Sequence, residues 1–336
     1  MAKFKVVVLP CDYDDLDVER EILEPLGAEV VRVESFDKEE IAEAARDADA
    51  LLVQHTYIDE ELLSKLRKCK VAVRYGTGYD NFDLDAMTRH GVYAAYVPDY
   101  CTDEVAAHAL ALLLALERKI VRYNDRVREG VWSSLDERPI FDLRERTLGI
   151  IGLGRIGGAL ASKAKGIYGG IIACDPYIPE GRFAELGVER VDMDELFERS
   201  DAVSVHVPLF RKPTGIYRPT YHLIGERELR RMKPTSYIVN TSRGGVIDTE
   251  ALVKALREGW IAGAALDVIE GEPPRGRAST DLHLKLGDLL REGKLILTPH
   301  AGYLSERALR EVRRRAAEEV ARVLKGGRPL NCLNQL

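Results

Sequence analysis

A glycine-rich turn directly after an apolar strand is the feature that most constrains the fold of this chain. The run Gly152–Gly157 reads G-L-G-R-I-G, follows an expected strand over 147–151 and precedes an expected helix over 159–165. Glycines at this spacing permit a tight turn, a close approach of the backbone to a pyrophosphate, and packing of the helix on the strand. The free N–H groups at the start of the helix then face the phosphates. The pattern predicts a dinucleotide-binding unit.

An acidic residue indicates which dinucleotide is bound. Asp175 ends the next expected strand, 18 residues after Gly157. A carboxylate at this place binds the ribose 2′-hydroxyl and repels a 2′-phosphate. The spacing therefore favours NAD over NADP, although the basic residues Arg211, Lys212 and Arg218 follow later in the chain. The alternative is a structural strand-turn-helix with an aspartate on its surface.

Short β-branched runs alternate with amphipathic stretches through both halves of the chain. At 336 residues the chain is about twice the usual domain length, so we expect two domains. The alternation predicts an α/β fold with parallel sheets. Between the halves we expect one long helix from Asp103 to about Arg128, with Thr102 as its N-cap, and we expect a last helix over 305–324.

Composition excludes several classes of protein. The formal charge of −6 argues against a bulk nucleic-acid binder. Five scattered cysteines indicate neither a disulfide framework nor a zinc site, so we expect a reducing compartment and no metal. The longest apolar stretch, 109–116, is too short to span a membrane, and we expect a cytoplasmic protein. Two Gln and five Asn among many charged residues favour a thermophilic source over a biased genome.

Three charged residues follow three further expected strands. Arg243 comes after the strand 236–240, Glu272 after 262–266, and His300 after 295–297. Because the carboxyl ends of parallel strands line the ligand crevice, all three should face the same cofactor. Reduction of a 2-keto acid requires a proton donor, a cation that polarises the carbonyl, and a carboxylate that holds the imidazole. Taken singly, each residue could instead be an ordinary loop residue.

The order of these motifs resembles that of the D-isomer-specific 2-hydroxyacid dehydrogenases over nearly the whole chain. The resemblance implies two Rossmann-like or flavodoxin-like parallel-sheet domains, with the NAD domain inserted into the catalytic domain. The NAD-binding Rossmann domain is then residues 101–300, and the discontinuous catalytic domain is 1–100 with 301–336. The motifs that carry the resemblance are the glycine run, Asp175-Pro176-Tyr177, His206-Val207-Pro208-Leu209, Arg243, Glu272-Pro273 and Thr298-Pro299-His300.

The same resemblance implies roles for individual residues. His300 acts as the acid or base with Glu272 as its partner, and Arg243 binds the substrate carbonyl and carboxylate. A turn after the strand 71–74 offers unpaired backbone N–H groups to the substrate carboxylate. The expected substrate-binding residues are His55, Arg74, Tyr75, Gly76, Thr77 and Tyr303. The expected NAD-binding residues are Gly152, Gly154, Arg155, Ile156, Gly157, Asp175, His206, Val207, Pro208, Thr241, Ser242, Asp267 and Gly302.

Short matches, among them Gln54-His55-Thr56 and the ending Asn331–Asn334, are most similar to the C-terminal-binding-protein branch of the family. The predicted activity is NAD-dependent interconversion of a small 2-keto acid and its D-2-hydroxy acid, with glyoxylate-like or hydroxypyruvate-like substrates favoured. The alternatives are D-3-phosphoglycerate oxidation and a corepressor-like protein that senses NAD(H). The resemblance also implies a homodimer built by the long helix. Two segments, 212–220 and 282–291, look like insertions.

Overall fold

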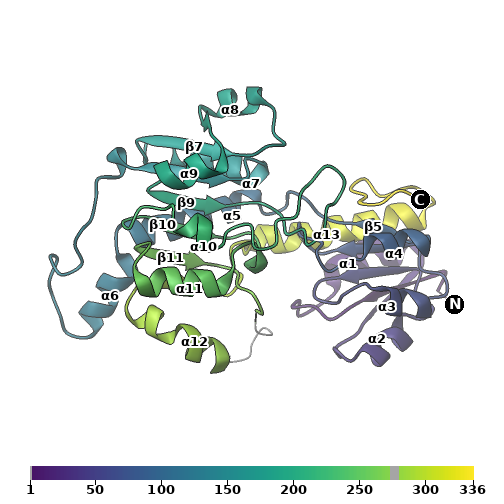
Figure 1. Ribbon diagram of the computed structural model, residues 1–336. Coiled ribbons are helices and arrows are strands. Elements are labelled where there is room, and N and C mark those ends of the chain that lie inside the picture. Colours follow the sequence, from purple (N-terminus) through teal and green to yellow (C-terminus); the bar gives the residue numbers. More distant parts are fainter. Residues whose placement is uncertain (1, 273–279) are drawn as a thin grey trace. The chain divides into compact units, whose positions relative to one another are not determined.

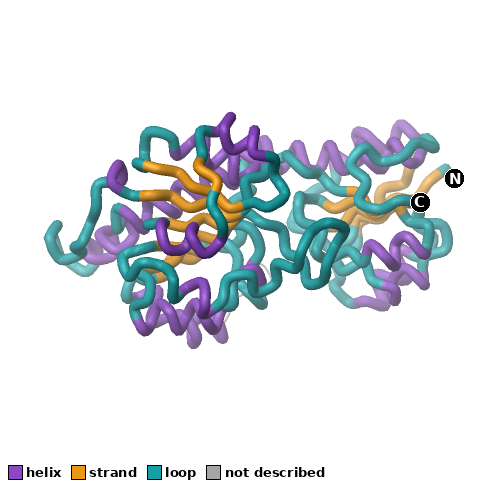
Figure 2. Tube along the Cα trace, turned by 45° about the horizontal axis from the view of Figure 1, so that its top comes forward, coloured by secondary structure: helices purple, strands orange, loops and turns teal. Residues whose placement is uncertain are grey.

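The computed structural model of this protein describes residues 2–272 and 280–336. The chain divides into two compact units, and the division separates both ends of the sequence from its middle. Unit 1 consists of Met1–Tyr100 and Ser305–Leu336, and unit 2 consists of Cys101–Leu304. Within the described part of the chain, no helix is long and apolar enough to cross a membrane. Each unit contains a parallel sheet with helices on both faces (Figure 1; Figure 2).

Unit 1 is built on a five-stranded parallel sheet with the order β2-β1-β3-β4-β5. This is the flavodoxin-like order, in which the chain reverses its direction of winding next to β1. The strands are β1 (Phe4–Val8), β2 (Ala28–Arg32), β3 (Ala50–Val53), β4 (Val71–Arg74) and β5 (Tyr93–Ala95). The helices are α1 (Asp17–Leu23), α2 (Lys38–Ala45), α3 (Glu60–Lys65), α4 (Leu84–Arg89) and α13 (Glu306–Leu324), with the 3₁₀ turn η1 (Glu24–Leu26).

The C-terminal segment completes unit 1. Helix α13 packs against α1, β3 and β4, and its buried Arg313 pairs with the buried Glu19 of α1 at 2.7 Å. After the helix, Cys332 forms an antiparallel bridge with Ala95 of the edge strand β5. The Asn334 side chain accepts a hydrogen bond from the Ala94 N–H at 2.9 Å. The tail therefore covers an edge that would otherwise present unpaired backbone groups.

Unit 2 is built on a seven-stranded parallel sheet with the order β12-β11-β10-β9-β6-β7-β8. The order is that of a doubly wound dinucleotide-binding fold, whose ligand crevice lies at the switch point between β6 and β9. The strands are β6 (Thr147–Ile151), β7 (Gly170–Cys174), β8 (Glu189–Arg190), β9 (Ala202–Val205), β10 (Tyr237–Asn240), β11 (Gly263–Leu266) and β12 (Leu295–Leu297). The helices are α5 (Thr102–Glu117), α6 (Ile120–Arg128), α7 (Arg155–Ala164), α8 (Glu180–Leu186), α9 (Met193–Arg199), α10 (Glu226–Leu229), α11 (Thr249–Glu258) and α12 (Thr280–Arg291), with the 3₁₀ turns η2 (Leu143–Glu145) and η3 (Gly244–Val246).

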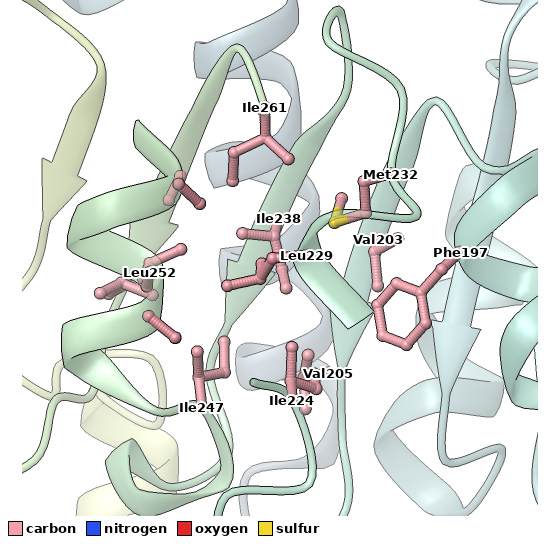
Figure 3. Packing of buried hydrophobic residues seen from close by; sticks show 14 of the residues in the cluster. Phe197, Val203, Val205, Ile224, Leu229, Met232, Ile238, Ile247, Leu252 and Ile261 are labelled. Atoms are coloured by element: carbon pink, nitrogen blue, oxygen red, sulfur yellow. The ribbon is translucent and has the colours of Figure 1, made fainter. Parts of the chain in front are cut away.

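Alternate residues of the central strands enter two different cores, as a sheet covered on both faces requires. Ile238 of β10 packs with α9, α10 and α11 on one face, where Phe197, Leu229 and Leu252 surround it (Figure 3). Its neighbour Val239 packs on the other face with α5 and α7. Each face is thus covered by an apolar core, and the sheet holds its C-terminal loops on a rigid support.

The predicted α/β fold class with two parallel-sheet domains is confirmed. The prediction of one long helix is wrong, because α5 ends at Glu117 and α6 begins at Ile120. Lys119 between them adopts the left-handed conformation with φ of 56°, and its Nζ lies 5.2 Å from the centre of the Tyr237 ring. The prediction of Thr102 as N-cap is also wrong, since Cys101 occupies that position without a side-chain hydrogen bond.

Candidate active site

The glycine-rich turn lies between β6 and α7, as the sequence predicts. Gly152 has φ of 90°, and a Cβ at Gly157 would lie only 2.0 Å from the Gly152 carbonyl oxygen. Only glycine permits this contact between turn and helix. By contrast, a Cβ at Gly154 would meet nothing within 4 Å, so open space adjoins the N-terminus of the ten-residue helix α7. The turn therefore has the shape and the free helix N-terminus that a pyrophosphate requires.

Two neighbouring segments border this turn. A Cβ at Gly152 would lie 2.9 Å from Val207 Cγ1 and 3.0 Å from the His206 carbonyl oxygen, so the segment after β9 packs directly on the turn. Asp175 accepts a hydrogen bond from the Leu153 N–H at 2.9 Å and another from the Tyr177 N–H at 3.0 Å. The structure thus brings the glycine turn, Asp175 and the His206 segment together. Their donors and shape fit a bound NAD.

His206 is held as a neutral imidazole. Desolvation lowers the pKa of this side chain to about 4, and its Nε2 lies 2.9 Å from Ser204 Oγ. The His206 N–H donates to the Ile151 carbonyl oxygen at 2.8 Å, which ties the ends of β9 and β6 together. At neutral pH this residue therefore carries no positive charge at the end of β9, beside the glycine turn.

The segment 212–220, which looks like an insertion in the sequence, packs near Asp175. The Tyr217 ring lies 4.9 Å from the Tyr177 ring and stacks on Phe210, with ring centres 5.5 Å apart. The Arg218 N–H donates to the Tyr177 hydroxyl oxygen at 2.8 Å. This segment therefore supports the residue that comes two positions after Asp175. The second segment that looks like an insertion, 282–291, falls within α12.

The Arg243 loop is shaped by a residue that the sequence analysis does not assign to the site. The buried Asn240 side chain accepts hydrogen bonds from the Ser242 N–H and hydroxyl, and it donates to the Arg243 carbonyl oxygen at 2.9 Å. An asparagine followed two residues later by serine is a recognisable Asx-turn signal in the sequence. Beyond it, a Cβ at Gly244 would lie 2.0 Å from the carbonyl carbon of Ile269. The loop after β10 thus packs directly on the loop after β11.

Glu272 and His300 form a hydrogen-bonded pair. Glu272 Oε2 lies 2.8 Å from His300 Nδ1, and both side chains are about one-third exposed. His300 adopts the left-handed backbone conformation with φ of 53°, which is uncommon outside glycine. The Tyr303 ring lies edge-on to the imidazole, with ring centres 6.4 Å apart. A carboxylate on Nδ1 orients the imidazole and leaves its Nε2 for a reacting group.

Asp267 anchors the loop that carries His300. Its buried carboxylate accepts hydrogen bonds from the Thr298 hydroxyl at 2.6 Å and from the N–H groups of Ala301 and Gly302 at 2.8 Å each. Burial opposes ionisation, but hydrogen bonds from His108, Thr298, Ala301 and Gly302 lower the pKa of Asp267 to about 2. Asp267 therefore stabilises the loop, a role that its prediction as a cofactor-binding residue does not include.

In unit 1 the turn after β4 has fewer unpaired N–H groups than the sequence predicts. The N–H groups of Tyr75 and Gly76 are not unpaired, because they donate to the Val53 carbonyl oxygen at 2.8 Å and to the Arg74 carbonyl oxygen at 2.9 Å. Within the described residues, the N–H groups of Thr77 and Gly78 have no such acceptor. The Tyr75 N–H is paired because the carbonyl of Val53, the last residue of β3, lies within reach of the turn.

Two further groups in unit 1 border this turn. The Tyr75 hydroxyl donates to the buried Glu19 at 2.8 Å, and this contact fixes the Tyr75 side chain. His55, which follows β3, lies 3.0 Å from Asp12 Oδ1. Among the described residues of the chain, no group of three or more His, Cys, Asp or Glu side chains is arranged to hold a metal ion.

Together, a doubly wound sheet, a glycine turn with its acidic partner, and a histidine–glutamate pair near an arginine loop define a dinucleotide-dependent oxidoreductase. Residues 110–302 match the sequence model of the D-isomer specific 2-hydroxyacid dehydrogenase, NAD binding domain. The chain belongs to this family. It carries the family's NAD-binding domain, and its activity class is that of a NAD-dependent 2-hydroxyacid dehydrogenase.

Several known proteins are similar over most of the chain. A glyoxylate reductase of Korarchaeum cryptofilum is 43% identical over 307 residues, which cover 89% of this chain and 86% of that protein. A D-3-phosphoglycerate dehydrogenase of Methanocaldococcus jannaschii is 38% identical over 93% of this chain, but only 56% of that protein is covered. The crystal structure of D-lactate dehydrogenase from Aquifex aeolicus, complexed with NAD and lactic acid, has a TM-score of 0.84 and 30% identity, with 96% of each chain covered. The finer resemblance to the C-terminal-binding-protein branch stays a prediction.

Proposed function

We propose that this chain reduces glyoxylate, or a similarly small 2-keto acid such as hydroxypyruvate, to the corresponding D-2-hydroxy acid. The observation that carries the proposal is the pair of Glu272 Oε2 and His300 Nδ1 at 2.8 Å, in the same unit as the glycine turn and Asp175. Similarity to a glyoxylate reductase over 89% of the chain supports the choice of substrate.

Each residue of the proposed site has a chemical task. NADH, when bound, supplies the hydride for the carbonyl carbon. His300 in its protonated form gives a proton to the carbonyl oxygen, while Glu272 holds the charged imidazole in place. Arg243, whose loop is fixed by Asn240 and by contact with Ile269, polarises the carbonyl and binds the carboxylate.

We assign the substrate carboxylate to the turn after β4 in unit 1, and we assign the substrate side chain to Tyr303 of unit 2. The N–H of Thr77, the Arg74 guanidinium, and Tyr75 and Gly76 beside them form the proposed carboxylate site. His55 is paired with the carboxylate of Asp12 at 3.0 Å, and Gln54 donates to the same carboxylate at 3.0 Å. A phosphate group would be repelled by this carboxylate. The pairing therefore favours glyoxylate or hydroxypyruvate over 3-phosphoglycerate, the substrate that the relative of Methanocaldococcus jannaschii suggests.

We also propose that the chain forms a homodimer and works in the cytoplasm. Helix α6 and the segment after it extend away from the sheet of unit 2 (Figure 1). This region exposes several large apolar side chains, and Trp132 has 91% of its surface exposed. Exposed apolar patches of this kind mark protein–protein contacts. Light scattering of Trp132→Lys should give a lower mass than the parent chain if the patch is the dimer contact.

The cysteines support the proposed cytoplasmic location. All five are free, which is in keeping with a reducing compartment.

Steady-state turnover of a panel of 2-keto acids with NADH tests the proposed activity. We expect glyoxylate and hydroxypyruvate to be turned over faster than 3-phosphohydroxypyruvate. His300→Asn should lower kcat by at least about 100-fold while NADH affinity changes little. The matched control is His90→Asn, because His90 forms an equally close pair with Glu60 in unit 1, at 2.7 Å. Tight NADH binding without turnover of any acid would contradict the proposal and favour a NAD-sensing role.

A further inference from the structure

His108 connects helix α5 to the loop that carries His300. The side chain is about three-quarters buried, and its Nε2 lies 3.0 Å from Thr298 Oγ1 and 3.4 Å from Asp267 Oδ1. Its ring also lies against the backbone of Gly302, where a Cβ would come within 3.4 Å of the imidazole Cδ2. One side chain of α5 thus touches the strand end, the anchoring carboxylate and the far end of the loop.

The direction of these hydrogen bonds is determined by the carboxylate. Because the Thr298 hydroxyl donates to Asp267 Oδ1 at 2.6 Å, its oxygen is the acceptor for His108. His108 Nε2 must therefore carry a hydrogen and donate it. The Asp267 carboxylate accepts from Thr298, Ala301 and Gly302 and has His108 beside it. His108 supplies the donor on the side of the carboxylate that faces α5.

The backbone at His300 requires such support. A non-glycine residue with φ of 53° is strained, and such a conformation persists only where its surroundings determine it strongly. The His300 N–H donates to the Asp267 carbonyl oxygen at 2.8 Å, and the next two N–H groups donate to the Asp267 carboxylate. The position of the imidazole is therefore set by Asp267, and the position of the Asp267 side chain depends on His108 and Thr298.

We propose that His108 is a positioning residue for the reaction: its Nε2–H, acting through Thr298 and Asp267, holds the Thr298–Gly302 loop so that the His300 imidazole meets the substrate carbonyl. The inference rests on the proposed role of His300. A displacement of a catalytic group by about 1 Å can lower the rate by about 100-fold without loss of binding. The effect of losing His108 should thus fall on kcat.

Two replacements distinguish positioning from simple packing. The amide nitrogen of His108→Gln can occupy the place of Nε2, whereas that of His108→Asn lies nearer the place of Nδ1. We expect His108→Asn to lower kcat between about 10- and 100-fold, with the KM for the keto acid and the Kd for NADH within about threefold of the parent. We expect His108→Gln to restore kcat to within about threefold of the parent.

Thr298 offers an independent pair of variants in case the His108 variants do not fold. Thr298→Ser keeps the bridging hydroxyl and should keep kcat, whereas the isosteric Thr298→Val should lower kcat as His108→Asn does. Equal kcat in His108→Asn and His108→Gln, or in Thr298→Val and Thr298→Ser, would overturn the inference. If the parent chain turns over glyoxylate and His300→Asn does not, such a result contradicts only the role of His108. Activity retained in His300→Asn would instead contradict the proposed function.

Discussion

The carboxylate of Asp175 accepts a hydrogen bond from the Leu153 N–H at 2.9 Å, so the acidic residue after β7 is fixed to the glycine turn after β6. Leu153 is fully buried, which makes this contact a rigid one. The carboxylate that we expect to select between NAD and NADP and the turn that we expect to receive the pyrophosphate are therefore held in one arrangement. Changes at either residue should affect cofactor choice rather than the chemical step.

Replacement of Asp175 by serine should relax the preference for NADH. The carboxylate that binds the ribose hydroxyls and repels a 2′-phosphate would be lost. We expect the ratio of kcat/KM for NADH over NADPH to fall by at least about tenfold, which corresponds to about 1.4 kcal/mol. Asp194→Ser is a suitable control, because Asp194 forms an exposed ion pair with Arg227 in the same unit. An unchanged ratio in Asp175→Ser would show that another group selects the cofactor.

Replacement of Gly244 by alanine should displace the Arg243 loop. The new Cβ would lie 2.0 Å from the carbonyl carbon of Ile269 and 2.5 Å from the Glu270 nitrogen, and neither backbone atom can move independently. We expect kcat/KM to fall by at least about tenfold and the free energy of unfolding to fall by about 1–3 kcal/mol. Gly245→Ala is the matched control, since the atoms nearest to its Cβ would belong to the side chains of Tyr221 and Leu209, at 3.3 Å or more. Equal activity of the two variants would contradict the importance of this contact.

The parts of the fold that depend on local patterns could be predicted from the sequence. Alternation of β-branched runs and amphipathic stretches indicates parallel sheets. The run Gly152–Gly157 indicates a tight turn, because the close contacts there permit only glycine. The break at Lys119 could not be predicted. The surrounding sequence favours a continuous helix, and the left-handed residue faces Tyr237, more than one hundred residues further on. Tertiary contacts of this kind leave no periodic signal.

The candidate site shows the same limit. The rule that parallel strands end at one edge of a sheet leads directly to Arg243, Glu272 and His300. The hydrogen bonds that hold them are non-local: Asp267 is bonded to the N–H of Gly302, and His108 to Thr298. Donors and acceptors so far apart in the chain become partners only after the sheet has formed. Sequence patterns therefore point to candidate reacting groups more readily than to the residues that position them.

Acid should destabilise unit 2 through His206. Desolvation lowers the pKa of this side chain from its ordinary value of 6.5 to about 4 in the folded protein. Between these two values the unfolded chain binds a proton that the folded chain does not, so stability falls as the pH falls from 6.5 to 4. The loss should be about 2–3 kcal/mol, since one pKa unit corresponds to about 1.4 kcal/mol.

Calorimetry of the parent chain and His206→Gln from pH 7 to pH 4 measures this effect. The variant lacks the titrating group, so its Tm should decrease less over this pH range than that of the parent. His222→Gln is a control, because His222 lies in the same unit but is one-third exposed and paired with Glu270 at 2.9 Å. Parallel curves for the parent and His206→Gln would contradict the prediction.

Loss of Arg146 should destabilise unit 2 more than loss of any exposed ion pair. Arg146 and Glu117 are both almost fully buried, with the Arg146 Nε 3.1 Å from the carboxylate, and burial raises the pKa of Glu117 to about 7 although Arg146 faces it. Arg146→Met would leave this carboxyl group without its partner and should lower the free energy of unfolding by about 3–5 kcal/mol. The exposed pair of Arg199 and Glu189 is the control, and Arg199→Met should lower the free energy of unfolding far less than Arg146→Met does. In denaturant unfolding, the double variant with Glu117→Met and Arg146→Met should have a higher free energy of unfolding than Arg146→Met alone. The reason is that no ionisable group of this pair then remains buried. If the double variant is no more stable than Arg146→Met, the loss comes instead from the hydrogen bonds that Arg146 donates to the carbonyl oxygens of Asp201 and Thr235.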